Sequence, residues 1–116
     1  MAPTTLIGQK TTTSPIGRNP EQAGFPIKMA ELLATLDGAA YIARVSVCRP
    51  KYIIQAKKAM TKAFDTQIKG LGYSMVEILS QCPTDWHMTP VDATNWVEEQ
   101  MIPHYPLGEF KAPEER

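Results

Sequence analysis

The fold is decided by residues 41–79, YIARVSVCRPKYIIQAKKAMTKAFDTQIKGLGYSMVEIL. Residues 41–47 and 73–79 are apolar runs containing β-branched and aromatic side chains, which are typical of strands. Between them, apolar side chains recur every three or four positions from about Pro50 to Lys69, which predicts a helix. A strand, a helix of about twenty residues and a second strand together predict a βαβ crossover with two parallel strands.

One further helix is predicted before this unit and one after it. Pro26 is expected to start a first helix, because a proline in the first turn needs no N–H partner. Thr89, followed by Pro90 and Asp92, is the expected N-cap of a third helix, which should end at 102–103. The predicted fold class is therefore α/β, with a partial parallel sheet.

The chain is expected to be part of one domain. Residues 1–25 are rich in Thr, Pro and Gly, and should form either an arm against another part of a larger protein or a loose terminus. Residues 26–102 carry the α/β elements, and residues 103–116 are expected to form an extended tail. Two parallel strands are too few for a sheet, so further strands are expected upstream or in another chain. The isolated chain is expected to self-associate.

The composition excludes several classes of function. Twelve basic and twelve acidic residues give a formal net charge of zero, so nothing favours binding to nucleic acid or to an anionic membrane. No apolar stretch approaches the roughly 20 residues of a membrane span, and no signal-peptide pattern opens the chain. Two cysteines, Cys48 and Cys82, make no disulfide framework, which fits a reducing cytoplasm. His87 and His104 lack a metal-like spacing.

Cys82 is the candidate residue for chemistry. It lies after the second predicted strand in EILSQCPTDW (77–86), directly before Pro83, which cannot extend a strand inside a sheet. The carboxyl ends of strands are where open α/β sheets assemble their sites. From the residues alone, Cys82 is either a small buried hydrophobe or a ligand or nucleophile. A disulfide between Cys48 and Cys82 is disfavoured in a reducing compartment.

Charged residues leave two further questions open. Arg44 and Glu77 lie inside otherwise apolar strands, so they either pair across the sheet or point out along an exposed edge. Lys57, Lys58 and Lys62 form either a solvated helix face or a basic patch that docks a partner protein.

Four stretches of the chain carry a resemblance to a known family. They are 2–8 (APTTLIG), 11–17 (TTTSPIG), 30–38 with 40–45 (AELLATLDG, AYIARV), and the Cys82 segment with 103–110 (PHYPLGEF). The pattern resembles the carboxyl-terminal half of the thiamine-diphosphate-binding (beta) subunit of 2-oxoacid:ferredoxin oxidoreductases, of the branched-chain 2-oxoacid or 2-oxoglutarate type.

The resemblance implies the second half of a thiamine-diphosphate-binding domain. The whole enzyme would decarboxylate a 2-oxoacid, pass electrons through iron–sulfur clusters to ferredoxin, and form acyl-coenzyme A. Cys82 is implied as the fourth ligand of a 4Fe–4S cluster, and Thr4 and Thr5 as residues at the edge of the cofactor cleft. The implied partners are the alpha subunit and, in some enzymes, gamma and delta subunits.

Several family signatures are absent from this chain. The Gly-Asp-Gly, Asn and Thr-Gly-Gly-Gln residues that bind the diphosphate and Mg²⁺ are missing, as are the other three cluster cysteines. We therefore expect the isolated chain to bind no cofactor and to be inactive. The alternative hypothesis is an autonomous small α/β binding or assembly module without catalysis.

Overall fold

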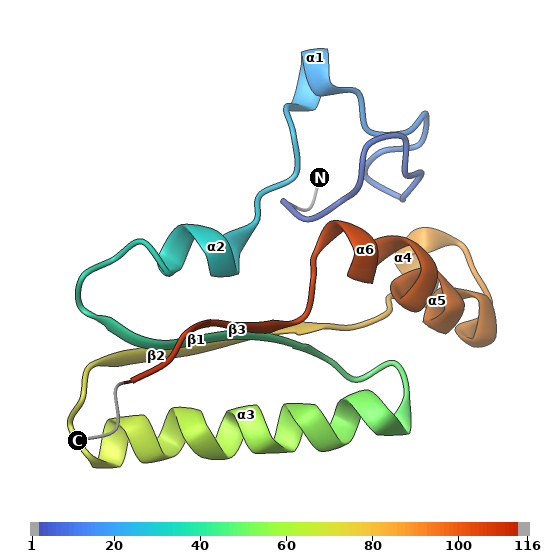
Figure 1. Ribbon diagram of the computed structural model, residues 1–116. Helices are drawn as coiled ribbons and strands as arrows, with labels where there is room; N and C mark the ends of the chain where they lie inside the picture. Colours follow the sequence, from blue (N-terminus) through green and yellow to red (C-terminus); the bar gives the residue numbers. More distant parts are fainter. Residues whose placement is uncertain (1–2, 114–116) are drawn as a thin grey trace.

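The computed structural model describes residues 3–113, and the predicted βαβ unit lies at its centre (Figure 1). Strand β1 spans Ala39–Ser46, helix α3 spans Pro50–Ile68, and strand β2 spans Tyr73–Leu79. The two strands pair in parallel, and α3 crosses between them over one face of the sheet. The predicted parallel crossover is confirmed.

A third strand was missed in the sequence. Strand β3, Gly108–Lys111, pairs antiparallel with β1, so the sheet is mixed and has the order β2-β1-β3. The expected extended tail therefore includes a strand, and its last three residues, 114–116, lie outside the described part. Phe110 explains this placement, because it packs against Ala30 and Ile42 in a small core cluster.

Helix α3 covers one face of the sheet through small side chains. Ala56 and Ala59 pack against Tyr41, Ala43 and Val45 of β1, so the helix lies close to the strand. The predicted apolar stripe of α3 is only partly buried. Four of its large apolar side chains are exposed: Ile53, Met60, Phe64 and Ile68.

The opposite face is covered by a shorter helix than expected. Helix α2 spans only Met29–Leu33 and begins three residues after Pro26. Its buried residue Ala30 contacts Ala39 and Ile42 of β1. The predicted helix start at Pro26 is thus wrong, and the chain from residue 26 to 28 precedes the helix.

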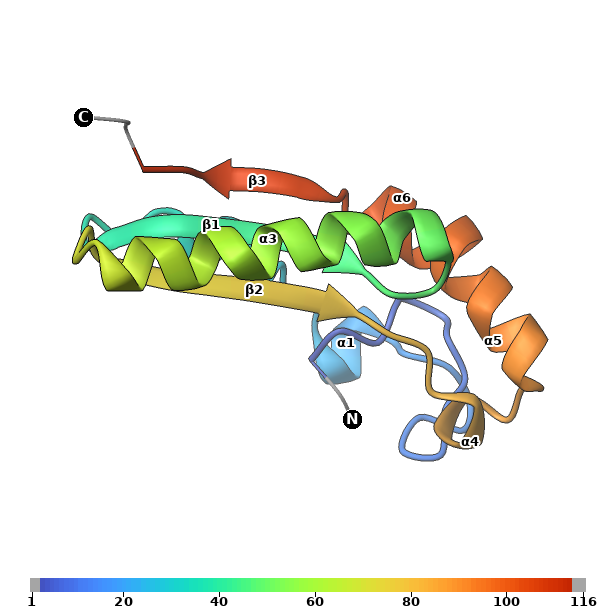
Figure 2. The same ribbon diagram turned by 90° about the horizontal axis from the view of Figure 1, so that it is seen from below.

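Short helices gather at the carboxyl ends of β1 and β2 (Figure 2). Helix α4 spans Pro83–Trp86 and helix α5 spans Pro90–Trp96. The side chain of Thr89 accepts a hydrogen bond from the Asp92 N–H at 3.2 Å, which confirms the predicted N-cap. Among the described residues, a further four-residue helix, α1 at Pro20–Ala23, lies in the amino-terminal arm.

The third helix ends within two residues of the predicted 102–103, but it is not one regular α-helix. It continues through a π-helical segment, η1 at Val97–Met101, into α6 at Ile102–His104. Pro103 has no N–H to donate to the preceding turn, and the wider π turn accommodates it. Val97 and Met101 are buried in a core cluster at this end of the sheet.

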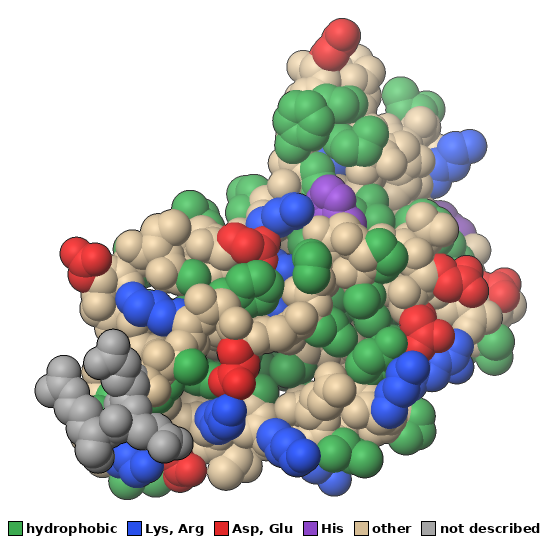
Figure 3. All heavy atoms as spheres, viewed as in Figure 1, with side chains coloured by type: hydrophobic (Ala, Val, Ile, Leu, Met, Phe, Trp, Pro, Cys, Tyr) green, Lys and Arg blue, Asp and Glu red, His purple; other side chains and the backbone are tan. Residues whose placement is uncertain are grey.

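The face on the β3 side carries mostly charged and polar side chains along α3 (Figure 3). Lys62 forms an exposed ion pair with Glu109 of β3 at 2.9 Å, and Lys57 and Lys58 are also exposed. Exposure fits both a solvated face and a docking patch, so the two alternatives for these lysines stay open. No helix within residues 3–113 combines the length and apolar character needed to cross a bilayer.

Candidate functional site at the carboxyl ends of the parallel strands

Cys82 lies three residues beyond the end of β2. It is the N-cap residue of α4, and its side chain is exposed, whereas Cys48 is buried in the core cluster. Pro83, expected only to stop the strand, also begins α4, which the sequence did not predict. Both cysteines are free thiols. The exposed Cys82 thiol is thus accessible to a group bound outside the described chain.

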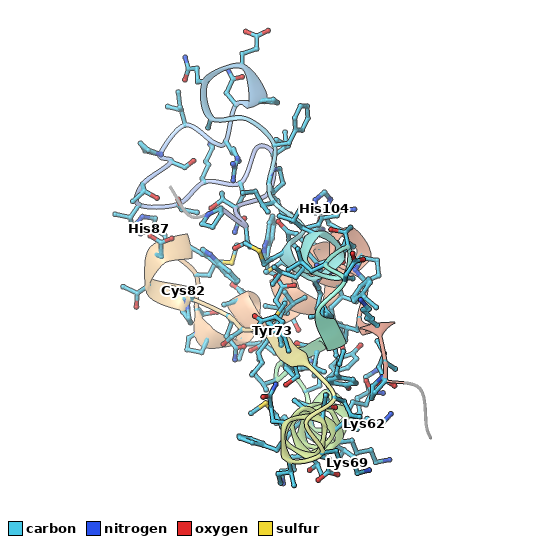
Figure 4. All side chains as sticks on the ribbon, turned by 90° about the vertical axis from the view of Figure 1, so that its left-hand side faces the viewer. Lys62, Lys69, Tyr73, Cys82, His87 and His104 are labelled. Atoms are coloured by element: carbon cyan, nitrogen blue, oxygen red, sulfur yellow. The ribbon has the colours of Figure 1, made fainter. Side chains whose placement is uncertain are left out.

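The amino-terminal arm packs directly on the Cys82 segment. The Thr12 N–H donates to the Asp85 carbonyl at 3.0 Å, and Thr12 Oγ1 lies 3.3 Å from His87 Nε2. His87 adopts a left-handed conformation with φ of 57°, which ends α4 and turns its ring toward the arm. Figure 4 places Cys82 and His87 on the same helical turn, well away from His104. The arm therefore restrains the turn that carries the thiol.

The arm is ordered around one buried guanidinium. Arg18 is 7% exposed, and its three nitrogens donate to backbone carbonyls on both sides of it in sequence. The acceptors are Pro3 (3.4 Å), Thr5 (3.0 Å), Ala23 (3.1 Å), Gly24 (3.1 Å) and Phe25 (3.3 Å). A buried arginine needs such partners, and here backbone oxygens supply them. The described part of residues 1–25 is thus an ordered arm rather than a loose terminus, and it packs on this chain itself; the expected contact with another part of a larger protein stays a prediction.

A glycine is required where the arm closes on itself. Gly17 has φ of 91°, and a Cβ there would lie 2.8 Å from the Gly8 carbonyl oxygen. Any other residue at this position would clash with backbone, which cannot move aside as a side chain can. Gly8 also has a positive φ, of 78°, but a Cβ there would meet no atom within 4 Å.

Thr4 and Thr5 lie at the base of the arm. The Thr4 carbonyl accepts a hydrogen bond from the Tyr105 hydroxyl at 2.9 Å, and Thr5 is 5% exposed. Burial raises the pKa of Tyr105 to about 12, so the hydroxyl keeps its proton for this bond. These contacts fix the arm to the core cluster that also contains Cys48 and Leu79.

A buried arginine of β1 joins this strand to β2 and to helix α2. Arg44 is fully buried, and its guanidinium lies 2.7 Å from Glu77 of β2 and 2.7 Å from Glu31 of α2. It also lies 5.3 Å from the ring centre of Tyr105 and 5.1 Å from that of Phe110, within cation–π range. The pairing alternative predicted for Arg44 and Glu77 is confirmed. These charges stabilise the fold, and none of these contacts joins them to the Cys82 thiol.

His104 belongs to this same structural region. Burial lowers its pKa, and the nearby cations Lys28 and Arg44 act in the same direction. Its Nε2 is buried without a hydrogen-bond partner. Because its neutral form is favoured and it is far from Cys82 in Figure 4, His104 does not join the thiol in one site.

The described residues do not by themselves fit an iron–sulfur cluster. Such a cluster is held by four cysteine thiolates or closely related ligand sets. Across residues 3–113, no group of three or more His, Cys, Asp or Glu side chains is placed to hold a metal ion. A cluster held in part by Cys82 would therefore need ligands from outside the described residues.

The chain is related in sequence to subunits of 2-oxoacid oxidoreductases. Over 111 residues, 96% of its length, it is 42% identical to ketoisovalerate oxidoreductase subunit VorA of Methanothermobacter thermautotrophicus. Over the same length it is 44% identical to the subunit of that name in Methanothermobacter marburgensis. Over 99 residues, 85% of its length, it is 37% identical to 2-oxoglutarate synthase subunit KorB of Archaeoglobus fulgidus.

The similarity covers only part of each relative. The chain spans 23% of each VorA subunit and 33% of KorB. No family model matches the chain, and no solved structure matches it. The resemblance found in the sequence is thus confirmed at the level of a 2-oxoacid oxidoreductase subunit.

Proposed function

We propose that this chain is the carboxyl-terminal part of the thiamine-diphosphate-binding (beta) subunit of a 2-oxoacid:ferredoxin oxidoreductase. The observation that carries the proposal is the similarity, across 96% of the chain, to subunits of 2-oxoacid oxidoreductases. The α/β fold supports it, because an exposed thiol lies beyond the carboxyl end of a parallel strand, where open α/β sheets assemble their sites.

The complete enzyme would oxidatively decarboxylate a 2-oxoacid to acyl-coenzyme A in the cytoplasm and reduce ferredoxin. Thiamine diphosphate with Mg²⁺ would supply the decarboxylation chemistry, and a 4Fe–4S cluster would carry the electrons. The alpha subunit, and in some enzymes gamma and delta subunits, would complete the assembly. This chain by itself is inactive in our proposal, because it lacks the residues that bind the diphosphate and three of the four cluster ligands.

Within that enzyme, Cys82 would be the fourth cluster ligand. The position of Cys82 depends on two restraints. Thr12 of the arm contacts Asp85 and His87, and Trp86 packs against the hydrophobic core residues at this end of the sheet. A thiolate on a restrained turn presents its sulfur at a fixed place, which a rigid cluster requires. Thr4 and Thr5 would lie at the edge of the cofactor cleft, held by Tyr105 and Arg18.

A chimeric subunit tests this function. The 111 matched residues of the Methanothermobacter thermautotrophicus VorA subunit are replaced by the corresponding part of this chain, and the enzyme is assembled anaerobically with its partner subunits. We expect ketoisovalerate-dependent reduction of ferredoxin, and its loss in the chimera that also carries Cys82→Ser. Cys48→Ser is the matched control and should keep the activity. An assembled, soluble chimera without activity would contradict the proposal.

A further inference from the structure

Positive charge is concentrated on helix α3. Residues 50–69, which are α3 and its C-cap, contain five lysines and one acidic residue, Asp65, although the formal net charge of the whole chain is zero. Figure 3 shows Lys and Arg side chains gathered along this helix. The exposed side of α3 is therefore basic, and the rest of the chain carries the balancing negative charge.

Four of these lysines lie in one row along the helix. Their spacing of seven, four and seven residues places all four within a sector of about 40° around the helix axis, over a length of about 27 Å. All four side chains are exposed, and Figure 4 shows Lys62 and Lys69 on the same side of α3. We name this set the lysine row: Lys51, Lys58, Lys62 and Lys69.

A groove lies between the lysine row and strand β3. It has a volume of about 340 Å³, and Lys58 and Lys62 line it from the side of α3. Small residues from three elements also line it, namely Ala43 of β1, Ala59 of α3 and Gly108 of β3. Because these residues fill little space, the groove can accept apolar side chains of another protein beside the row of charges.

The chain itself shows how a carboxylate binds to the lysine row. The Lys62 ammonium donates to both carboxylate oxygens of Glu109 in β3, at 2.9 and 3.2 Å. Within residues 3–113, no acidic side chain forms an ion pair with Lys51, Lys58 or Lys69. Three of the four ammonium groups can therefore pair with carboxylates of another molecule.

We propose that the lysine row and the groove beside it bind an acidic amphipathic helix of a transiently associating partner protein. Carboxylates seven, four and seven residues apart on that helix match the spacing of the row, as do the charged pairs that flank the seam of a coiled coil. Apolar side chains on the adjoining side of the same helix enter the groove. This inference depends neither on the function proposed above nor on the role of Cys82.

The lysine row suits a transient partner better than a permanent subunit. Lysine is depleted in protein interfaces, and permanent interfaces are more apolar than this surface. The exposed Phe64, two residues after Lys62, points to nearly the opposite side of α3 and does not contribute to the row. Attraction between exposed charges accelerates encounter with an oppositely charged protein and weakens as salt is added, which is typical of transient association.

The test uses this chain and a synthetic peptide. The probe is an amphipathic helical peptide with glutamates seven, four and seven residues apart, and a peptide of the same composition in scrambled order is its control. In fluorescence titrations at low salt, we expect the probe to bind at least about tenfold more tightly than the scrambled peptide. Raising the ionic strength to about 0.15 M should weaken binding of the probe by roughly tenfold.

Charge reversal locates the binding surface. The triple variant Lys51→Glu/Lys58→Glu/Lys69→Glu should weaken binding of the probe by roughly thirtyfold, because like charges then face each other. The matched control, Lys10→Glu/Lys28→Glu/Lys57→Glu, changes the net charge by the same amount away from the row and should bind within about threefold of wild type. Circular dichroism spectra should be the same for all three proteins.

Four results would overturn the inference. They are failure of the probe to bind, equal binding of the probe and the scrambled peptide, equal losses in the two triple variants, and binding of a double-stranded DNA oligonucleotide as tight as that of the probe. The first three would reduce the lysine row to a solvated face, and the last would identify a surface for polyanions in general. None of these measurements involves iron or catalysis, so their outcome is separate from that of the Cys82 assignment.

Discussion

Removal of the Arg44 guanidinium should be among the most damaging single changes in this chain. Arg44→Met keeps the approximate volume and apolar stem but leaves Glu77, whose side chain is 15% exposed, without its cation. Loss of one partner from a buried ion pair costs about 3–5 kcal/mol, because the other charge stays buried and unpaired. Glu31 is 34% exposed and is screened by water, so the loss of its pairing with Arg44 adds less to the destabilisation.

Urea unfolding, followed by the fluorescence of Trp86 and Trp96, measures the change. A loss of about 3–5 kcal/mol is a large share of the roughly 5–15 kcal/mol that stabilises a typical domain. The double variant Arg44→Met/Glu77→Leu should lose less than Arg44→Met alone, because no buried charge is left over. The exposed pair gives the control: Lys62→Met should cost at most about 1 kcal/mol. A loss for Arg44→Met no larger than that for Lys62→Met would refute the reasoning.

Three other expectations follow from the arm and the site. Gly17→Ala should destabilise the chain by about 1–3 kcal/mol and clearly more than Gly8→Ala, and equal losses in urea unfolding would contradict the predicted clash. The folded pKa of Tyr105, about 12, exceeds its unfolded value of about 10, so its stabilisation is complete below pH 10 and is lost as pH rises toward 12. Tyr105→Phe should reduce the loss of stability between pH 10 and 12, and an unchanged dependence of stability on pH would contradict this prediction. Calorimetric titration of the isolated chain with thiamine diphosphate and Mg²⁺ should detect no binding, and a micromolar dissociation constant would disprove the expectation.

The centre of the fold could be predicted because its signals are local and long. The helix from Pro50 has many turns of apolar periodicity, and both flanking strands are apolar runs. The pairing of Arg44 with Glu77 was an open alternative, because it depends on the register between the two strands. In the structure the two residues lie directly opposite each other in β1 and β2. Thr89 was predicted as an N-cap because capping requires only neighbouring residues.

The missed features depend on distant parts of the chain. Strand β3 has four residues, too few for a periodic pattern, and it forms because β1 offers a free edge. The contact of Thr12 with Asp85 joins residues far apart in sequence, and no local signal indicates it. Periodicity identified the apolar face of α3, to which the exposed Phe64 belongs, but it does not indicate whether anything within the chain covers that face.

The most direct test of the central claim is a measurement of iron and acid-labile sulfide in the complete subunit. Wild type, Cys82→Ser and Cys48→Ser are assembled anaerobically with their partners and compared. Serine is a much poorer iron ligand than a thiolate, so Cys82→Ser should lower both contents and the rate of ferredoxin reduction. Cys48→Ser, which changes only a buried core thiol, should keep both. A Cys82→Ser enzyme with full iron and sulfide and wild-type ferredoxin reduction would contradict the assignment of Cys82 as a cluster ligand.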